Sequence, residues 1–574
     1  MRTASKRIQL VGLSIAAAVG VAALGSATTT QRVAQPVRAF VAPQLVATAQ
    51  THPQQAFQVI LQGTGTTGQG SVLAAVRRVV HGKGLGLGRR LDTIAGASAT
   101  VTGRQLVALA SAKGVAAITL DRPVHLTDTT GTSGTSGSTN LSTNQLWPEA
   151  ARVEQGWSAA ANGNLPTPPA IAFVDSGIVA SRADFSSGAR VIDRTTIVTS
   201  GTPNSGADGY GHGTFVAGIA AGSANNYAGA APSAPIVSID VLNDQGMALT
   251  SDVIAACDWI LQHKTADNIR VANFSLNSTL PASVFWDPLD AAVEKLWFSG
   301  IVVVAAAGNY GTGSTPSGVV NAPANDPFVI TVGADDIGDK PGTWDDTAAP
   351  FSAWGYTYDG FAKPDIAAPG RYMAGPVPVS STLATTRSSS LVASNYIQLS
   401  GTSFAAPVIS GAAAYLLALH PNWTPDKIKG ALMLSARPEA NATPGSVGVG
   451  LIDLNAASSV TGPPNPNLVL DTFLVANPSG GTIPVFDTFA WQAAARANPA
   501  WDQAAWGSAA WGSAAWGSAA WGSAAWGSAA WGSAAWGSAA WGSSALAQML
   551  ASAQAAWGSA AWGSAAYADS APQR

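Results

Sequence analysis

The feature that most constrains the fold is a regular alternation of apolar and helical segments between about residues 147 and 457. Its apolar segments are continuous runs, which is typical of strands buried on both faces of a parallel sheet. These runs are residues 171–174, 236–241, 270–276, 301–306 and 328–332. Helical patterns separate or follow them at residues 252–263, 283–297, 404–419 and from 424 onward. This order predicts a doubly wound α/β domain, a mostly parallel sheet with helices on both faces.

The amino terminus has the pattern of a secretory signal. Basic residues among the first seven precede an apolar run over residues 10–24, and small residues follow at 25–27. A transmembrane anchor is the alternative, but the run is shorter than the ~20 residues that a spanning helix needs. We therefore expect residues 1–27 to be cleaved and the protein to be secreted.

The composition excludes several kinds of site. Cys257 is the only cysteine, so the chain has no intrachain disulfide and no cysteine-based metal cluster. This cysteine lies in an apolar run, which favours a buried hydrophobic role over catalysis. Export without disulfides fits a bacterial secretion route. The balance of 29 Lys and Arg against 32 Asp and Glu argues against a nucleic-acid-binding protein.

A small unit is expected between the signal and the α/β domain. Residues 28–55 look unstructured, whereas residues 57–123 show the order strand, helix, two strands, helix, strand. That order fits a ferredoxin-like α+β fold. The Thr-, Ser- and Gly-rich residues 127–146 then predict a flexible linker that proteases can cut.

The carboxyl-terminal part is of low complexity. Residues 461–503 begin with a Pro- and Asn-rich stretch and are expected to be a linker. Residues 504–574 form a tail in which Ala-Ala-Trp-Gly-Ser occurs eight times in a row from 504 to 543 and twice more over 555–564. A period of five places the tryptophans all around a helix and on alternating sides of a strand. Neither arrangement buries one surface, so we expect disorder, with a β-solenoid as the alternative.

Two polar residues of the α/β domain stand where chemistry is expected. In open α/β sheets, active sites lie beyond the carboxyl ends of the strands. Asp175 directly follows the run 171–174, where a carboxylate is costly unless it is paired; a turn or cap role is the alternative. Of the histidines in this domain, His263 and His420 follow helices, whose dipole favours them there without chemistry. His212 lies between two glycines and has no such explanation.

A candidate nucleophile and a candidate oxyanion donor follow later in the chain. Ser403 begins the helix 404–419, where the dipole favours negative charge. Asn309 follows the run 301–306, and its amide is suited to donate to an oxyanion. The order serine, acid, histidine of the α/β-hydrolases is excluded, because no Asp or Glu lies between Ser403 and His420. The order that remains is Asp175, His212, Ser403.

Three sequence motifs resemble the signatures of the subtilisin-like serine peptidases, the subtilases. They are Asp175-Ser176-Gly177, Gly211-His212-Gly213-Thr214 and Gly401-Thr402-Ser403-Phe404-Ala405-Ala406-Pro407. Supporting segments lie at 275–276, 306–309 and 363–370. The resemblance covers residues 150–457. It departs from the family at Phe215, where a second histidine is common, and at 223–227, which is shorter than the family's calcium loop.

The resemblance implies a catalytic role for four residues. Ser403 attacks the scissile carbonyl, His212 takes its proton, and Asp175 orients the imidazole and stabilises its charge. Asn309 and the backbone amide of Ser403 bind the oxyanion. The chain is then a secreted endopeptidase that cleaves proteins or peptides and requires no cofactor for this chemistry.

The resemblance also implies how substrate binds. Substrate adds as a strand beside Ser275, Leu276 and Asn277, with Asn277 standing where a glycine is usual. Tyr310 lies next to Asn309 in the pocket wall, which predicts a preference for large apolar or aromatic residues before the cut.

Further roles follow for the flanking parts. Residues 28–126 resemble, over 57–123, an inhibitory propeptide that folds with the catalytic domain (147–460) and is cut off between 122 and 145. Asp184 matches a position that binds calcium in many subtilases, so calcium is expected as a structural ion.

Other functions remain open at this point. In one, the repeats attach the protein to the cell surface or a matrix and the protease domain only processes its own chain. In another, the chain is a catalytically silent binder. The exposed indoles of the tail suit contact with the cell envelope, with a polysaccharide or with one another; a dispensable tail that is trimmed during maturation is the alternative.

Overall fold

The computed structural model describes residues 39–497, except for 65–67, 127–144, 155, 158–164, 200–202, 314, 339–344 and 479. The expected signal, most of the expected linker 127–146 and the repeat tail therefore lie outside the described residues.

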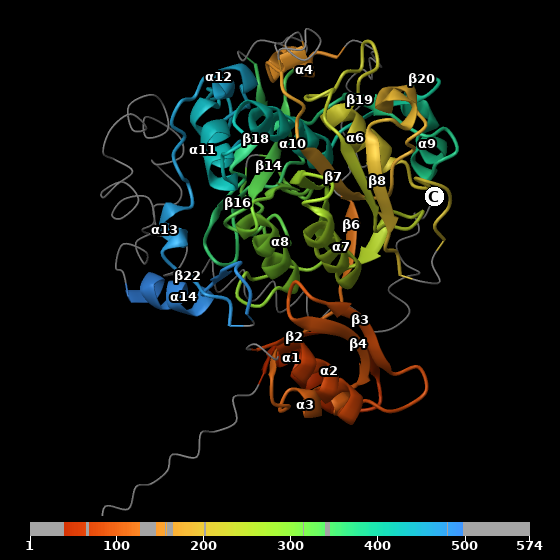
Figure 1. Ribbon diagram of the computed structural model, residues 1–574, viewed down its shortest axis with the longest axis vertical. Coiled ribbons are helices and arrows are strands. Elements are labelled where there is room, and N and C mark those ends of the chain that lie inside the picture. Colours follow the sequence, from red (N-terminus) through yellow and green to blue (C-terminus); the bar gives the residue numbers. More distant parts are fainter. Residues whose placement is uncertain are drawn as a thin grey trace, which may run out of the picture. The chain divides into compact units, whose positions relative to one another are not determined.

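A twisted, mostly parallel sheet forms the centre of the α/β domain (Figure 1). Its strand order is β15-β14-β13-β11-β7-β9-β8, with β18 also paired to β14, and only β15 is antiparallel. The runs expected as strands are found in it, buried as predicted. The strands are β7 (Ala170–Asp175), β8 (Val191–Thr196), β9 (Ile236–Asp240), β11 (Ile269–Phe274), β13 (Val302–Ala306), β14 (Ile330–Asp336), β15 (Thr347–Ala348) and β18 (Ile366–Pro369).

Two pairs of helices pack with this sheet, which confirms the predicted α/β class. Helices α6 (His212–Ala221) and α10 (Thr402–Leu419) contact each other, as do α7 (Thr250–His263) and α8 (Pro288–Phe298). The predicted helix at 283–297 begins later, because Asp287 accepts a hydrogen bond from the backbone amide of Leu289 and so caps the helix.

Helix α10 passes through the core of the domain. By length and composition it is apolar enough to cross a membrane, but 89% of its residues are buried inside the protein, as expected of a core helix. Gly411 lets it approach α6, because a Cβ atom there would lie 2.6 Å from the carbonyl oxygen of Ala220. The amino ends of α6 and α10 also lie together, because the rings of His212 and Phe404 are in contact.

The amino-terminal unit (residues 39–126) has its own sheet, β1-β5-β2-β4-β3, and its own apolar core. The predicted strand and helix order is present. Its elements are β2 (Ala56–Gly63), α2 (Gly68–Val79), β3 (Gly86–Leu91), β4 (Gly96–Thr102), α3 (Gly103–Leu109) and β5 (Val115–Leu120). The expectation that residues 28–55 are unstructured is wrong for β1 (Phe40–Val41) and α1 (Pro43–Thr51), because β1 pairs with β5 and α1 buries Leu45 and Ala49.

The segment after β5 joins the α/β domain. Strand β6 (Pro123–Leu126) lies between β10 (Met247–Leu249) and β12 (Leu276–Ser278) and pairs antiparallel with both. The predicted strand 270–276 is therefore two strands, because β11 ends at Phe274 and β12 pairs with β6.

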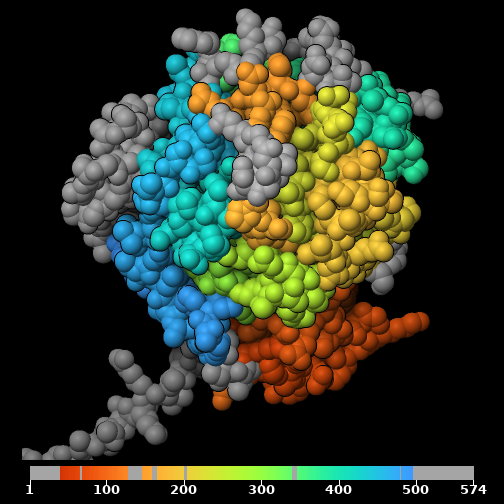
Figure 2. Space-filling model, turned by 45° about the horizontal axis from the view of Figure 1, so that its top comes forward, coloured from red at the N-terminus to blue at the C-terminus, as the bar shows by residue number. Residues whose placement is uncertain are grey.

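The expectation of a linker at 461–503 is wrong for the residues described there. They form α13 (Leu468–Asp471), the hairpin β22 (Leu474–Val475) with β23 (Val485–Phe486), and α14 (Thr488–Ala497). Trp491 is 1% exposed, and its ring stacks on Phe361 with centroids 4.8 Å apart. This carboxyl-terminal extension lies on the surface of the α/β domain, in blue in Figure 2.

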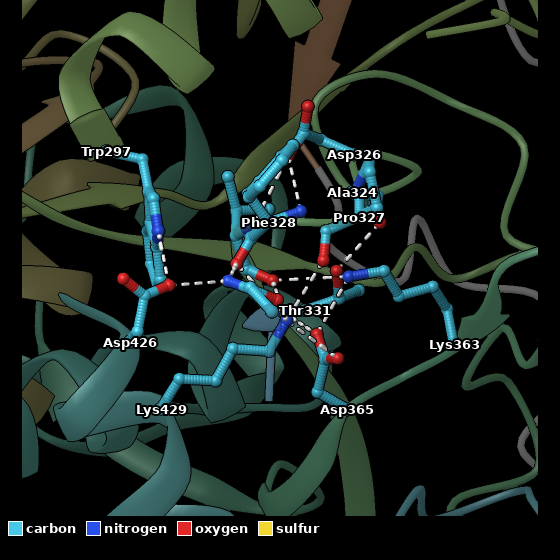
Figure 3. A network of polar contacts seen from close by, with 12 residues as sticks. Trp297, Ala324, Asp326, Pro327, Phe328, Thr331, Lys363, Asp365, Asp426 and Lys429 are labelled. Carbon is cyan, nitrogen blue, oxygen red and sulfur yellow. Dashed lines mark hydrogen bonds and ion pairs between the residues drawn. The ribbon is translucent and has the colours of Figure 1, made fainter. Parts of the chain in front are cut away.

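A buried ion network supports the edge of the sheet near β14 and β18 (Figure 3). The carboxylate of Asp365 binds Lys363 Nζ at 2.8 Å and Lys429 Nζ at 3.1 Å. Lys429 also donates to the backbone carbonyls of Pro327, Phe328 and Val329, each at 3.1 Å. Burial alone raises the pKa of Asp365, but the two ammonium groups outweigh it and hold the pKa below its usual value. The segment 363–370 of the sequence motifs thus has a structural role.

Helix α11 and several shorter elements make up the rest of the described structure. They are α4 (Trp147–Ala150), η1 (Ala183–Gly188), β16 (Gly355–Tyr356), β17 (Ala362–Lys363), β19 (Met373–Pro376), α9 (Thr382–Thr386), η2 (Ser388–Ser390), β20 (Leu391–Ala393), β21 (Tyr396–Leu399), α11 (Pro425–Ser435) and α12 (Leu454–Ser458).

Candidate active site

Asp175 and His212 form a buried pair at the carboxyl end of the sheet. Asp175 is the last residue of β7, and His212 is the first residue of α6. The Nδ1 atom of His212 lies 2.9 and 3.0 Å from the two carboxylate oxygens of Asp175, and both residues are fully buried. An Nδ1–H that donates to the carboxylate leaves Nε2 as the basic nitrogen of the neutral ring.

Asp208, which the sequence did not single out, ties the two residues of this pair together. Its Oδ1 accepts hydrogen bonds from Ser176 Oγ at 2.8 Å and from the amide of Gly211 at 2.7 Å, and its Oδ2 accepts from the amide of Thr214 at 2.8 Å. It thereby joins the turn after Asp175 to the start of α6. Burial raises the pKa of Asp208 to about 7, although these hydrogen bonds oppose the shift. The sequence signal that could have identified Asp208 is an acid between small residues, four positions before His212.

Ser403 lies at the amino end of α10, close to the imidazole. Its Oγ donates to the carbonyl oxygen of Ser275 at 3.1 Å, and Ser275 Oγ donates to the carbonyl oxygen of Ser403 at 2.8 Å. The ring of the next residue, Phe404, lies 5.3 Å from the His212 ring between centroids. Helix α10 therefore brings the candidate nucleophile to the side of α6 that bears His212.

The orientation of the Asn309 amide is fixed by Thr402. Asn309 Oδ1 accepts hydrogen bonds from the amide of Thr402 at 2.9 Å and from its hydroxyl at 3.0 Å. Because Oδ1 is held in this way, the Nδ2 hydrogens are the groups of this side chain that can donate to an oxyanion. Thr402 precedes Ser403, so the same turn positions both.

The residues expected to bind substrate face strand β6. In the antiparallel register, Leu126 pairs with Leu276 and His125 pairs with Asn277. On its other side β6 pairs with β10. A peptide segment that adds as a strand between two strands of a cleft is a common recognition mode. Leu276 and Asn277 pair with β6 at this edge, and Ser275 precedes them and accepts the hydrogen bond from Ser403 Oγ.

Tyr310, the residue expected in the pocket wall, contacts residues of its own loop. Its hydroxyl accepts a hydrogen bond from the backbone amide of Val320 at 3.1 Å, and its ring lies over Gly308. The side chain is thus held against its own loop, and it is 38% exposed.

The amino-terminal unit contacts the α/β domain through α7, α8 and the loop before α8. Asp121 accepts hydrogen bonds from the amide and hydroxyl of Ser251 at the start of α7, at 2.9 and 2.6 Å. Arg122 forms a buried ion pair with Asp287. Phe40 stacks on Trp286 with ring centroids 3.9 Å apart. Asp121 and Arg122 directly precede β6, so their contacts with the α/β domain fix the start of this strand.

The surroundings of Asp184 do not fit a calcium ion. Its carboxylate accepts hydrogen bonds from Arg182 Nε at 2.8 Å and from the Tyr396 hydroxyl at 2.6 Å. A guanidinium supplies positive charge and no oxygen ligand, whereas calcium takes six to eight oxygen ligands. Within the described part of the chain, no three His, Cys, Asp or Glu side chains are grouped to hold a metal ion.

Known proteins are similar to this chain over its α/β domain. Residues 168–450 match the subtilase family. Serine protease AprX of Bacillus subtilis (strain 168) is 37% identical over 265 residues, 44% of this chain and 59% of AprX. Subtilisin DY of Bacillus licheniformis is 32% identical over 290 residues, 50% of this chain and 90% of subtilisin DY.

The fold has a relative among solved structures. Fervidolysin from Fervidobacterium pennivorans, a keratinolytic enzyme related to subtilisin, matches with a TM-score of 0.52 and 22% identity, over 71% of this chain and 62% of fervidolysin. At this identity the likeness shows the fold alone. The chain thus spans less than two thirds of fervidolysin and of AprX. Because it matches nearly all of subtilisin DY, and the family pattern over 168–450, this chain belongs to the subtilase family.

Proposed function

We propose that the protein is a secreted serine endopeptidase that hydrolyses peptide bonds through an acyl-enzyme. Ser403 Oγ attacks the scissile carbonyl while His212 Nε2 takes its proton, and the same proton passes to the leaving amine. Water then attacks the acyl-enzyme while His212 takes its proton, and the acid is released as the proton returns to Ser403 Oγ. Asp175 holds the imidazole, and Asn309 Nδ2 and the Ser403 amide bind the oxyanion. The observation that supports this best is the buried Asp175–His212 hydrogen bond beside the amino end of α10. No cofactor takes part in these steps.

The amino-terminal unit is proposed to be an inhibitory propeptide. Strand β6 lies along the edge where substrate is expected, paired with β12 and β10. The chain would then be made as a zymogen that cuts itself. Ser403 Oγ donates to the carbonyl oxygen of Ser275. Because Leu276 pairs with Leu126 in antiparallel register, a strand that continues past Leu126 would place its next residue opposite Ser275. In the sequence Thr127 and Asp128 follow Leu126, so the first cut is expected between them.

The test combines labelling with sequencing of the cut chain. A fluorophosphonate probe should label Ser403 in the processed protein, and the first new amino terminus should be Asp128. Absence of labelling in protein that has lost residues 39–126 would contradict the proposal. The attachment role of the tail concerns residues outside the described part of the chain and remains a separate prediction.

Replacing Asn309 by alanine is expected to lower kcat by about 10²–10³, the magnitude known for the oxyanion-hole asparagine of subtilisin. The loss should appear in kcat with little change in KM, because the donor binds the oxyanion more tightly than the ground-state carbonyl. Steady-state kinetics on a peptide substrate measure both. A rise in KM with unchanged kcat would show that Asn309 binds the substrate instead.

The propeptide is expected to leave faster as the pH rises. Burial at the interface raises the pKa of Asp121 to about 6, although its hydrogen bonds to Ser251 oppose the shift. A free aspartate titrates near 4. Docking of the amino-terminal unit therefore takes up a proton between about pH 4 and pH 6. The contribution of Asp121 to docking is complete below about pH 4 and is lost as the pH rises to about 6. Burial also raises the pKa of Asp252 and Asp258, which face the propeptide.

This pH dependence is measurable as the delay before activity appears. Processed protein is incubated at a series of pH values and then assayed in one common buffer. The delay should shorten as the incubation pH rises through about 6, and Asp121→Asn should reduce this dependence. A delay that is the same at every pH would contradict the assignment to Asp121.

A further inference from the structure

The position of the substrate residue next to the cut follows from the pairing of β6 with β12. His125 lies opposite Asn277. Ser403 Oγ donates to the carbonyl oxygen of Ser275, two residues before Asn277. The carbonyl that this hydroxyl attacks therefore belongs to the substrate residue opposite Ser275, two positions after the one that occupies the place of His125.

Asn277 lies on the same face of these paired strands as the side chain of that substrate residue. Residues two apart in a strand point to the same side, and paired residues of neighbouring strands share a face. Ser275, Asn277 and the substrate residues opposite them thus share one face. On this face His125 is exposed, whereas Asn277 is only 1% exposed. Asn277 is therefore turned into the protein, beside the space that the substrate side chain must enter.

The Asn277 amide bridges two segments of the site. Its Nδ2 donates to the carbonyl oxygen of Ala306, the last residue of β13, at 3.1 Å. Ala306 precedes Asn309 by three residues, so the bridge runs from the substrate-binding strand to the segment with the oxyanion donor. Asn277 Oδ1 is buried and has no hydrogen-bond partner among the described residues. The bridge narrows the space beside the reacting carbonyl and leaves a hydrogen-bond acceptor in it.

We propose that Asn277 restricts the residue before the cut to small side chains and favours those with a hydroxyl donor. This inference rests on the proposed peptidase function and replaces the expected preference for large apolar or aromatic residues. An aromatic ring would have to displace the amide and break its bond to Ala306. A hydroxyl group of Ser or Thr can donate to Oδ1, which otherwise stays buried without a partner. The chain's own Leu126 is followed in the sequence by Thr127, a residue of this kind.

The experiment measures kcat/KM of the mature enzyme on four peptides. Each has Val-His-Leu before the variable residue, as in residues 124–126, and the variable residue is Ala, Thr, Val or Phe. The wild type should cleave after Ala at least about tenfold faster than after Phe, and after Thr several-fold faster than after its isostere Val. Asn277→Gly should raise the Phe-to-Ala ratio at least about tenfold and bring the Thr-to-Val ratio close to one.

Ser278→Gly is the matched control. It places glycine on the same strand, where the serine hydroxyl donates to the carbonyl oxygen of Leu280 and not across the site. The Phe-to-Ala ratio should stay as in the wild type. Asn277→Ala serves as a second variant if the glycine variant does not fold.

Four results would overturn the inference or part of it. A wild-type preference for Phe, or a Phe-to-Ala ratio that neither Asn277 variant changes, removes the role of Asn277 while leaving the peptidase function intact. A Thr-to-Val ratio near one in the wild type removes the hydroxyl preference alone. Cleavage of none of the peptides, with no labelling of Ser403, overturns both the inference and the proposed function.

Discussion

Replacing Ser403 by alanine is expected to lower turnover by about 10⁶, the magnitude known for the nucleophile of subtilisin. The variant removes the attacking oxygen but keeps the contacts of α10, because Ser403 contributes only one hydroxyl to a buried helix. It should also leave residues 39–126 joined to the rest of the chain, since the first cut is proposed to be the protein's own. Peptide hydrolysis and the mass of the purified chain measure the two effects.

The matched control for this variant is Ser400→Ala. Ser400 lies three residues before Ser403 and takes no part in the proposed chemistry. Its Oγ accepts a hydrogen bond from the amide of Tyr372. Its activity and processing should stay close to those of the wild type. Cleavage of Ser403→Ala at the same bond and to the same extent as in the wild type would show that another enzyme makes the cut.

The second large effect is expected on stability, from Asp365→Asn. Lys363 and Lys429 are each 2% exposed, and Asp365 is the carboxylate bound to both (Figure 3). Removing its charge deprives two buried ammonium groups of the carboxylate with which both form ion pairs, and breaking a buried pair typically costs about 3–5 kcal/mol. Denaturant unfolding, carried out in the Ser403→Ala background to prevent self-digestion, measures the loss.

A partly exposed ion pair provides the comparison for this second variant. Asp336 pairs with Arg371, and the two side chains are 21% and 23% exposed. Asp336→Asn should therefore cost about 1 kcal/mol or less. Equal losses for Asp336→Asn and Asp365→Asn would show that the two lysines are not held by Asp365 in the folded protein.

The parts of the fold that could be predicted are those specified by local pattern. The run 171–174 predicts a buried strand because every position is apolar, and the acid at its end indicates the sheet edge where an active site is expected. His212 and Ser403 could be selected by elimination and by chain order. The structure places all three at the ends of β7, α6 and α10, as that reasoning requires.

The parts that could not be predicted depend on partners far away in the sequence. Residues 461–503 have the composition of a linker because they begin with a stretch rich in Pro and Asn. Trp491 is nevertheless buried, because its ring stacks on Phe361, a residue far away in the sequence. Asp208 is an acid among small residues, and only the folded turn shows that it binds Ser176 and the start of α6. The direction of the Asn277 side chain depends on the carbonyl of Ala306, which no spacing in the sequence reveals.

In the proposed zymogen, strand β6 has a consequence for how long the peptidase would stay inactive after the proposed secretion. While β6 belongs to the same chain as β12, its binding is intramolecular and does not depend on protein concentration. Once the chain is cut after β6, the same contacts hold two separate molecules, and rebinding depends on how much propeptide surrounds the enzyme. Dilution into a large volume would then be enough to release activity, without any further signal.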